Sequence, residues 1–548
     1  MQRNIRSPRL LWAVPVLLLL QTVTAPALAA GGYPELLVLF RDWQAFERPV
    51  QLDGAPDYTA PAMLRRQAEL RSYQSRLAAI DPASWPKDQR IDYELVRAQM
   101  NGLDFELRVL QPWARDPAFY LSVWTEKSDT PEHEGPTHHG VVELWQYPLP
   151  LSRADQLKLA RELQVVPPLL AQARRNLTGN ARDLWLTGVG TMQGQVESLD
   201  DLAGRTKDAD PELGRSIAAA RSASAEFVTW LEAQAKSRTG PSGVGKEAYN
   251  WNLRHVHLVP LTWDDEVMLL KRELARAHAS LRFEEQRNRG LPQLAAASSP
   301  AEWDRRANEA VTRYLAWLKA KDILAVEDYL DPALRSHIGP YSPPETRNFF
   351  SIASHYEPIT LFAHFQHWLD HAWLTNAPNP SPIRREAWLY NVWDSRAEGT
   401  ATAMEELILH AGYYDDNPRA REIVWIMLAQ RCARGLASLY AQANLFDLQQ
   451  AKAFQVEWTP RGWMRPDLDL LGFEQQLYLR QPGYGTSYVT GKYLFDNLVK
   501  ERSHQLGDDF TLRRFFDEFN AAGMMPVSLI HWQLTGDAAL VPAPPDSR

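Results

Sequence analysis

Cysteine is almost missing from this sequence. Its 548 residues include a single cysteine, Cys432. One cysteine forms no intramolecular disulfide and supplies no thiolate cluster, so disulfide-stapled folds and cysteine-rich zinc modules are excluded. Low-complexity blocks and internal repeats are also missing, which excludes disordered and solenoid proteins. The composition, 45% hydrophobic and 23% charged, is typical of a globular protein with a large core.

Several functional motifs are missing too. There is no Gly-x-Ser-x-Gly elbow, and the glycine-rich stretch 240–245 has neither a preceding strand nor the spacing of a phosphate loop. Positive charge is in deficit, with 59 Lys+Arg against 67 Asp+Glu. We therefore expect no nucleic acid partner, because such binding depends on basic side chains that neutralise phosphates.

Residues 1–29 have the pattern of a secretory signal peptide. Arg3, Arg6 and Arg9 precede an apolar run at 10–20, and the alanines at 27 and 29, one residue apart, offer a cleavage site. The apolar run is too short for a membrane span. No cysteine follows it as a lipid attachment point. We expect a periplasmic or secreted protein with a net charge near −11 and no membrane association after cleavage.

Hydrophobic periodicity predicts an all-α protein. Apolar residues recur at helical spacing over 61–81 and 91–110, and no sustained period-2 alternation indicates strands. Ser152, Thr262 and Ser299 each stand three residues before an acidic residue, which is typical of a helix N-terminus.

The breaks between these helices are short enough to be loops within one body. We predict a single large helical domain over 30–535, with candidate lobes at 30–250 and 251–535. A flexible tail is expected at 536–548, where prolines and small residues gather.

Three histidines in the segment 359–373 are the main candidates for chemistry. On a regular helix His364, His367 and His371 lie within roughly 60° of arc. Imidazoles so placed suit a divalent metal, and His367 and His371 have the i, i+4 spacing that reaches one ion. The alternative is a buried polar face whose histidines are hydrogen-bonded to their neighbours.

Glu398 and Glu405 form a second candidate group. They are seven residues apart, hence on one helix face, and the alanines and threonines between them permit close helix packing. A carboxylate at such a packing site suits a metal or acid–base role, whereas the alternative is a solvated acidic stripe. The histidine-rich stretch 132–139 has no helical periodicity, so we interpret it as a loop.

Several stretches of the chain resemble the bacterial domain-of-unknown-function 885 family, whose members look like helical zinc peptidases of the gluzincin kind. The similar stretches are 77–81, 89–95, 174–177, 245–249, 398–405, 481–492, 510–513 and 523–526. The resemblance implies a gluzincin-like helical body, of the carboxypeptidase or oligopeptidase type, with a central cleft. It also implies zinc as the cofactor and a peptide or small molecule as the substrate in that cleft.

The sequence departs from this family at the zinc motif. The family pattern His-Glu-x-x-Pro-Gly-His-His corresponds to 364–371, where the first and last histidines, His364 and His371, match. Glu398 matches the third ligand, and Tyr488 stands where the family has a tyrosine that steadies an oxyanion. Phe365 replaces the glutamate that activates water.

Three hypotheses follow from this departure. The first is an exported metallohydrolase, weak or inactive as a peptidase, in which Glu405 or Asp370 takes over the role of base. The second is a non-catalytic descendant that binds a peptide or an envelope partner in the cleft. The third is a different metal-dependent enzyme that uses His364, His367 and His371.

Overall fold

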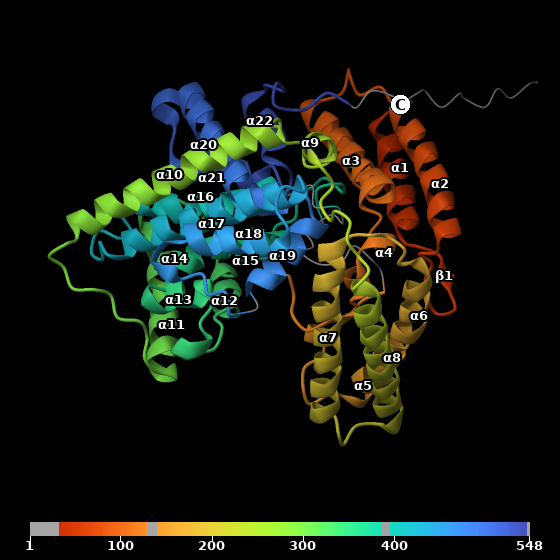
Figure 1. Ribbon diagram of the computed structural model, residues 1–548. Helices are drawn as coiled ribbons and strands as arrows, with labels where there is room; N and C mark the ends of the chain where they lie inside the picture. Colours follow the sequence, from red (N-terminus) through yellow and green to blue (C-terminus); the bar gives the residue numbers. More distant parts are fainter. Residues whose placement is uncertain (1–31, 129–139, 386–389, 391–393, 469, 545–548) are drawn as a thin grey trace, which may run out of the picture.

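The computed structural model describes residues 32–128, 140–385, 390, 394–468 and 470–544. The predicted signal peptide and the 132–139 stretch lie outside these ranges. Within them the regular secondary structure is almost entirely helical, which confirms the all-α prediction (Figure 1). The α-helices are α1 (Tyr33–Glu47), α2 (Ala60–Ala78), α3 (Lys87–Phe105), α4 (Pro112–Arg115), α5 (Arg153–Glu162), α6 (Val166–Asn176), α7 (Arg182–Arg205), α8 (Pro211–Ala235), α9 (Lys246–His255), α10 (Trp263–Arg287), α11 (Pro300–Ala320), α12 (Leu330–Arg335), α13 (Phe349–Tyr356), α14 (Ile359–Phe362), α15 (Gln366–Asn376), α16 (Asp394–His410), α17 (Ala420–Gln442), α18 (Leu448–Trp458), α19 (Leu470–Arg480), α20 (Tyr484–Leu506), α21 (Leu512–Ala521) and α22 (Val527–Thr535).

Short elements join these helices. A π-helical turn, η1 (Glu106–Leu110), extends α3. The 3-10 turns are η2 (Pro117–Tyr120), η3 (Leu144–Gln146), η4 (Leu163–Val165), η5 (Pro344–Thr346), η6 (Ala363–Phe365), η7 (Pro460–Gly462) and η8 (Gly507–Asp509). Two-residue strands form an antiparallel pair, β1 (Gln51–Leu52) with β2 (Ala55–Pro56), and a parallel pair, β3 (Val123–Trp124) with β4 (Val142–Glu143).

The predicted helix starts are confirmed at the atomic level. The side chains of Ser152, Thr262 and Ser299 accept hydrogen bonds from the backbone N–H three residues on, which satisfies donors that the first helical turn leaves open. Thr262 forms a full capping box with Asp265. At α11 the carboxylate of Glu302 instead accepts from the backbone N–H and hydroxyl of Ser298.

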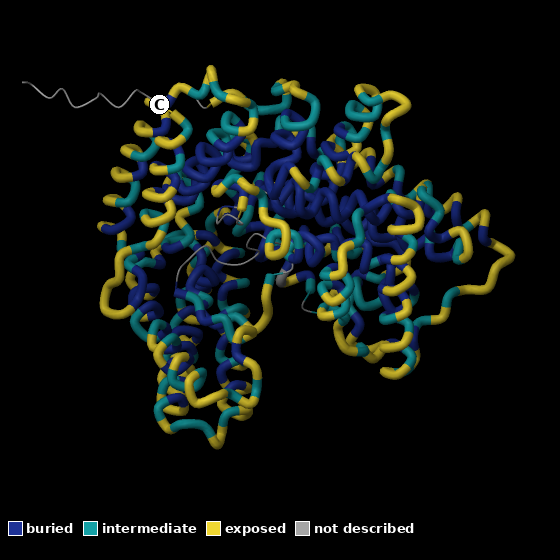
Figure 2. Tube along the Cα trace, turned by 180° about the vertical axis from the view of Figure 1, so that it is seen from behind, coloured by how far each residue is buried: buried dark blue, intermediate teal, exposed yellow. Residues whose placement is uncertain are grey.

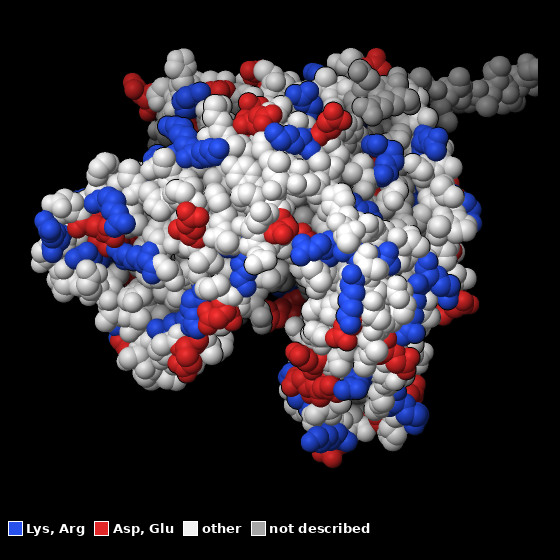
Figure 3. Space-filling view, viewed as in Figure 1, with Lys and Arg blue, Asp and Glu red and all other residues white. Residues whose placement is uncertain are grey.

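The helices lie in two groups with a few elements between them (Figure 1). Helices α1–α8 occupy one side and α11–α19 the other, while α9 and α22 lie at the top between them. The space-filling view shows a hollow between the α7–α8 hairpin and the part that contains α11 to α13 (Figure 3). Residues 536–544 of the tail that we predicted to be flexible lie partly against α3, where Arg97 Nη2 donates to Pro542 O at 3.2 Å.

The core is deepest around α16, α17 and the start of α20 (Figure 2). Helix α16 is buried on nearly all sides, yet many of its residues are polar or charged. A helix buried all round is usually apolar, because a buried charge is costly unless it is paired. The buried charges of α16 therefore mark the candidate functional site of this fold.

None of the helices in the described part of the chain combines the length and the apolarity that a membrane crossing requires.

Candidate metal centre

A change of helix type places the histidines of the segment 359–373. The path from α14 to α15 passes through the 3-10 turn η6, whose last residue, Phe365, leads directly into α15. In 3-10 geometry residues i and i+3 eclipse each other. His364, in the turn, and His367, in the first turn of α15, therefore point to a common place.

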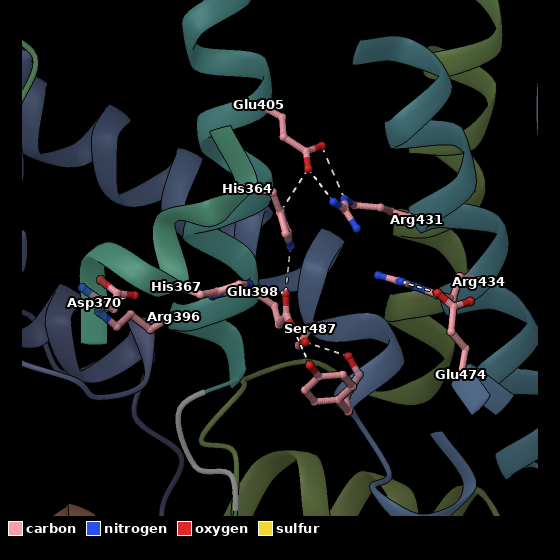
Figure 4. A network of polar contacts seen from close by, with 11 residues as sticks. His364, His367, Asp370, Arg396, Glu398, Glu405, Arg431, Arg434, Glu474 and Ser487 are labelled. Atoms are coloured by element: carbon pink, nitrogen blue, oxygen red, sulfur yellow. Dashed lines mark hydrogen bonds and ion pairs between the residues drawn. The ribbon is translucent and has the colours of Figure 1, made fainter. Parts of the chain in front are cut away.

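That place is the carboxylate of Glu398 on α16 (Figure 4). Its Oε2 lies 3.2 Å from Nε2 of His364 and 3.1 Å from Nε2 of His367. All three side chains are buried, with exposed fractions of 7%, 1% and 1% for His364, His367 and Glu398. The ligand atoms of the three residues lie within 4.8 Å of one another. We call this group the His–His–Glu triad.

The second oxygen of Glu398 is held from another helix. The hydroxyl of Tyr484, the first residue of α20, donates to Oε1 of Glu398. Burial would raise the pKa of Glu398, but His367 and His364 lower it further than burial raises it, so the pKa lies well below its ordinary value. Glu398 is thus an ionised carboxylate that presents one oxygen, Oε2, to the two imidazoles.

Glu405 lies on the far side of His364. Its Oε1 is 2.9 Å from Nδ1 of His364, and its carboxylate pairs with Arg431 of α17. Burial raises the pKa of Glu405, but Arg431 and His364 lower it more, and the net shift is downward. A carboxylate on Nδ1 orients the imidazole and leaves Nε2 directed at Glu398, as carboxylates commonly do behind metal-bound histidines.

The surrounding buried network has an unequal number of charges. It contains four carboxylates and three guanidiniums, so one negative charge is in excess when both imidazoles are neutral (Figure 4). The residues are Asp370, Glu398, Glu405 and Glu474, with Arg396, Arg431 and Arg434. Burying an uncompensated charge is costly, so the triad attracts a cation, either a proton shared by the imidazoles or a metal ion.

The triad fits a divalent metal of the zinc type. Two imidazoles and a carboxylate are a known zinc ligand set. Tetrahedral bonds of about 2.0–2.1 Å place ligand atoms about 3.3–3.4 Å apart. The observed separations of 3.1 and 3.2 Å between Glu398 Oε2 and the two Nε2 atoms are close to that spacing.

His371 does not join the triad, although we expected it to. It lies one turn further along α15 and stacks on Trp368 with a centroid separation of 5.2 Å. Burial, and then the charge of Lys127, lower its pKa to about 3. The physical reason is the turn η6, because the expected face of three histidines assumes a regular α-helix through residue 364.

Neither residue that we expected as a base faces the point where the triad converges. Asp370 is buried in an ion pair with Arg396. Glu405 contacts Nδ1 of His364, the ring nitrogen that faces away from Glu398. Both carboxylates are therefore occupied by structural contacts. Phe365, at the position of the missing glutamate, is half-buried and stacks on Phe362.

Tyr488 lies beside the triad, one turn after Tyr484 on α20. Its ring stacks on His364 at a centroid distance of 5.8 Å. The guanidinium carbon of Arg434 lies 3.9 Å from the centroid of the same Tyr488 ring. The ring thus lies parallel to the His364 imidazole, and its expected role with an oxyanion stays a prediction.

Sequence reasoning missed several residues of this network. Tyr484 is one of them, although it lies within the 481–492 stretch that carries the family resemblance. Arg431 and Arg434 flank Cys432 in a stretch of the sequence that is otherwise largely apolar. Their i, i+3 spacing inside an apolar run was the available signal, since an arginine there needs a buried partner.

Comparisons with known proteins agree with this architecture. The sequence model of a bacterial family described as a protein of unknown function (DUF885) matches residues 48–328. No curated protein matches the chain. The solved structure of a putative lipoprotein of unknown function from Shewanella oneidensis is similar with a TM-score of 0.66 and 17% identity, covering 92% of this chain and 98% of that one.

A second solved structure, a putative lipoprotein from Colwellia psychrerythraea, is similar with a TM-score of 0.64 and 15% identity. That match covers 92% of this chain and 97% of the other chain. At these identities the likeness shows a shared fold along almost the whole length.

Proposed function

Because this chain belongs to the DUF885 family of bacterial proteins of unknown function, we propose its function from its own site. It is an exported, peptidase-like protein that binds zinc through His364, His367 and Glu398 and hydrolyses its substrate weakly or not at all. The observation that carries the proposal is the convergence of these three buried side chains on one point.

The residues around the triad prepare it for a cation. Glu405 holds the Nδ1 side of His364, and Tyr484 holds Oε1 of Glu398, so that Nε2 and Oε2 remain for the ion. Such ordering of the ligands by their neighbours typically strengthens binding about 10- to 100-fold. Zinc, when bound at a site of this kind, polarises a substrate carbonyl and lowers the pKa of its water.

The weak activity follows from the residues that would accept a proton. A zinc hydrolase needs a carboxylate within hydrogen-bond reach of the attacking water. Phe365 accepts no proton. Asp370 and Glu405 are committed to Arg396 and Arg431. A positioned base contributes about 10²- to 10⁴-fold to the rate, and we expect the wild-type protein to lack that factor.

The experiment is to restore the base. Wild-type protein, Phe365→Glu and Phe365→Gln are purified, their metal content is measured, and hydrolysis of a fluorogenic peptide library is compared. Glutamine has nearly the size and polarity of glutamate but accepts no proton at neutral pH, which makes it the matched control. We expect one zinc per chain in all three proteins and hydrolysis that rises at least about 100-fold only in Phe365→Glu.

A non-catalytic scaffold is the competing function. If neither the wild-type protein nor Phe365→Glu takes up metal, the triad is a structural hydrogen-bond cluster and the proposal is wrong. If Phe365→Gln gains as much activity as Phe365→Glu, the missing carboxylate does not explain the weak hydrolysis.

A further inference from the structure

A groove of about 640 Å³ lies between α10, α17 and α18. Helix α17 packs against both of the other helices (Figure 1). The volume falls within the range of about 300–1,000 Å³ that is typical of pockets for small organic ligands. The groove shares no lining residue with the His–His–Glu triad, so it is a separate place in the fold. Its lining residues are Lys271, Leu274, Ala275, His278, Leu436, Tyr440, Leu445, Phe446, Phe454 and Trp458.

Helical spacing produces the shape of the groove. On α10 the lining residues stand at i, i+3, i+4 and i+7, which is one face of a helix. At a rise of 1.5 Å per residue this face is about 10 Å long, with Lys271 at one end and His278 at the other. The opposite side is formed by i, i+4 pairs, which are Leu436 with Tyr440 on α17 and Phe454 with Trp458 on α18.

Part of this apolar surface is open to water. The exposed fractions are 57% for Leu445 and 39% for Trp458, and the three other rings are half-buried. Those rings hold one another in edge-to-face contacts, since the centroid of Tyr440 lies 4.9 Å from that of Phe446 and 5.9 Å from that of Phe454. Exposed apolar surface of this kind often marks a binding site. The groove is therefore preformed and apolar, and it is accessible to a ligand.

The charge at the groove is positive. Lys271 is exposed, and in the described part of the chain it belongs to no ion pair. The neighbouring acidic residue, Glu273, pairs with Arg276 at 2.6 Å. None of the described lining residues is acidic. At the other end of the α10 face, His278 Nε2 lies 3.1 Å from the carbonyl oxygen of Trp458. Lys271 is thus the position where the anionic group of a ligand gains most.

We propose that this groove binds a free, single-chain fatty acid, with the carboxylate on Lys271 and the alkyl chain along the apolar face. An alkyl chain has no polar atom that would lose its hydrogen bonds there. Each methylene group that leaves water strengthens binding by about fourfold. The ammonium group of Lys271 attracts a carboxylate and repels a cationic head group. The site does not depend on the proposed metal.

The test is isothermal titration calorimetry of the mature protein with decanoate, octanoate, octanol and octylammonium, at concentrations where these chains do not aggregate. We expect decanoate to saturate one site per chain. Octanoate has two methylene groups fewer and should bind about tenfold more weakly. Octanol lacks the carboxylate and should bind at least about threefold more weakly than octanoate. Octylammonium should bind most weakly of the four.

Two variants locate the site. Lys271→Gln should lose the preference for octanoate over octanol and keep the affinity for octanol. Leu445→Asp places a negative charge at the exposed rim and should weaken decanoate binding at least about tenfold. The matched controls are Lys319→Gln, at an exposed lysine of α11, and Leu186→Asp, at a leucine of α7 that is 48% exposed. Both controls should bind decanoate like the wild type.

Three results would overturn the proposal. They are the absence of saturable decanoate binding at millimolar concentration, equal affinity for octanol and octanoate, and wild-type affinity in Leu445→Asp. Sedimentation with phosphatidylglycerol vesicles adds a fourth. A protein that binds these vesicles but no free decanoate uses the groove to dock on a membrane, and the proposed ligand is then wrong.

Discussion

At the scale of single residues, Glu398 joins several interactions in one carboxylate. Oε2 faces two imidazoles and Oε1 accepts from Tyr484, so the two oxygens face different parts of the chain. The same residue shows why burial alone does not set protonation. Glu398 and Glu266 are both fully buried, yet the pKa of Glu398 is lowered by the two imidazoles, whereas that of Glu266 is raised, because there burial outweighs the hydrogen bonds from neutral hydroxyls.

Glu266 provides a prediction about pH. Burial raises its pKa from 4.5 to about 7, despite hydrogen bonds from Tyr249 and Thr490. Between these values the folded state binds the proton and the unfolded state does not, so the free energy of unfolding falls as pH rises through this window. Glu266→Gln, which mimics the protonated side chain, should leave stability unchanged at pH 4 and raise it by about 3 kcal/mol at pH 8.

Urea unfolding at both pH values measures this difference. Glu247→Gln, an exposed site on α9, is the control and should give the same pH dependence as the wild type. An equal loss of stability with pH in Glu266→Gln and in the wild type would contradict the assignment.

At the scale of elements, the triad depends on the contact between α16 and α20. Gly399, next to Glu398, packs directly against the backbone of Gly491, and a Cβ on either glycine would overlap backbone atoms of the other helix. The absence of both side chains brings α20 close enough for Tyr484 to reach Glu398. The sequence analysis expected close packing from the alanines and threonines of this stretch, whereas the residue at the closest approach is the glycine beside Glu398, Gly399.

Gly399→Ala should therefore separate the two helices. We expect a loss of about 1–3 kcal/mol in the free energy of unfolding from overpacking, together with weaker metal binding as Tyr484 withdraws from Glu398. Gly194→Ala on α7 is the control, because nothing lies within 4 Å of its added Cβ. That variant should be neutral or more stable by about 0.5–1 kcal/mol. Thermal and chemical unfolding of both variants measure these changes in stability. Equal changes in the two variants would show that the contact between α16 and α20 tolerates a methyl group.

Elements also show what sequence patterns predict well. The helical ranges 61–81 and 91–110 correspond to α2 and to α3 with η1, because amphipathic periodicity is a local property. The helix caps were predictable for the same reason, because each depends on residues that are close in the sequence. The turn η6 was not predictable in this way, because a three-residue switch to 3-10 geometry leaves the hydrophobic pattern nearly unchanged. Of the three expected histidines, His364 in this turn and His367 just after it converge on Glu398, and His371 does not join them.

The rest of the site depends on long-range pairing. Tyr484 is 86 residues from Glu398, and Arg431 is 26 residues from Glu405. No single-sequence pattern specifies which buried arginine meets which carboxylate, since that follows from how the helices pack. The residue types of the site were therefore predictable, and their partners were not.

At the scale of the whole molecule, Asp92 links the N-terminal helices to the C-terminal part. Its carboxylate accepts from Tyr33 Oη at 2.6 Å, from Ser381 Oγ at 2.7 Å and from Arg384 Nε at 2.6 Å. Arg384 in turn donates to the carbonyl of Ala522 near the end of the chain. One buried carboxylate thus joins α1, α3 and two later segments.

Asp92→Ala should loosen this connection and leave Arg384 buried without its carboxylate. Removing one partner of a buried pair costs about 3–5 kcal/mol, and we expect α1–α3 to become sensitive to limited proteolysis before the remainder of the chain. Asp104→Ala, which breaks a partly exposed pair with Arg108, should cost about 1 kcal/mol or less. Similar losses in the two variants would mean that Asp92 does not hold the two parts together.

The central claim is that His364, His367 and Glu398, and not His371, form a zinc site. Zinc titration of the metal-free mature protein, followed by calorimetry, tests it most directly, with His367→Ala and His371→Ala as the paired variants. We predict one zinc per wild-type chain, a loss of affinity of more than about 100-fold in His367→Ala, and affinity within about threefold of wild type in His371→Ala. Loss of zinc from His371→Ala with retention in His367→Ala, or no zinc uptake by the wild-type protein, would contradict the account.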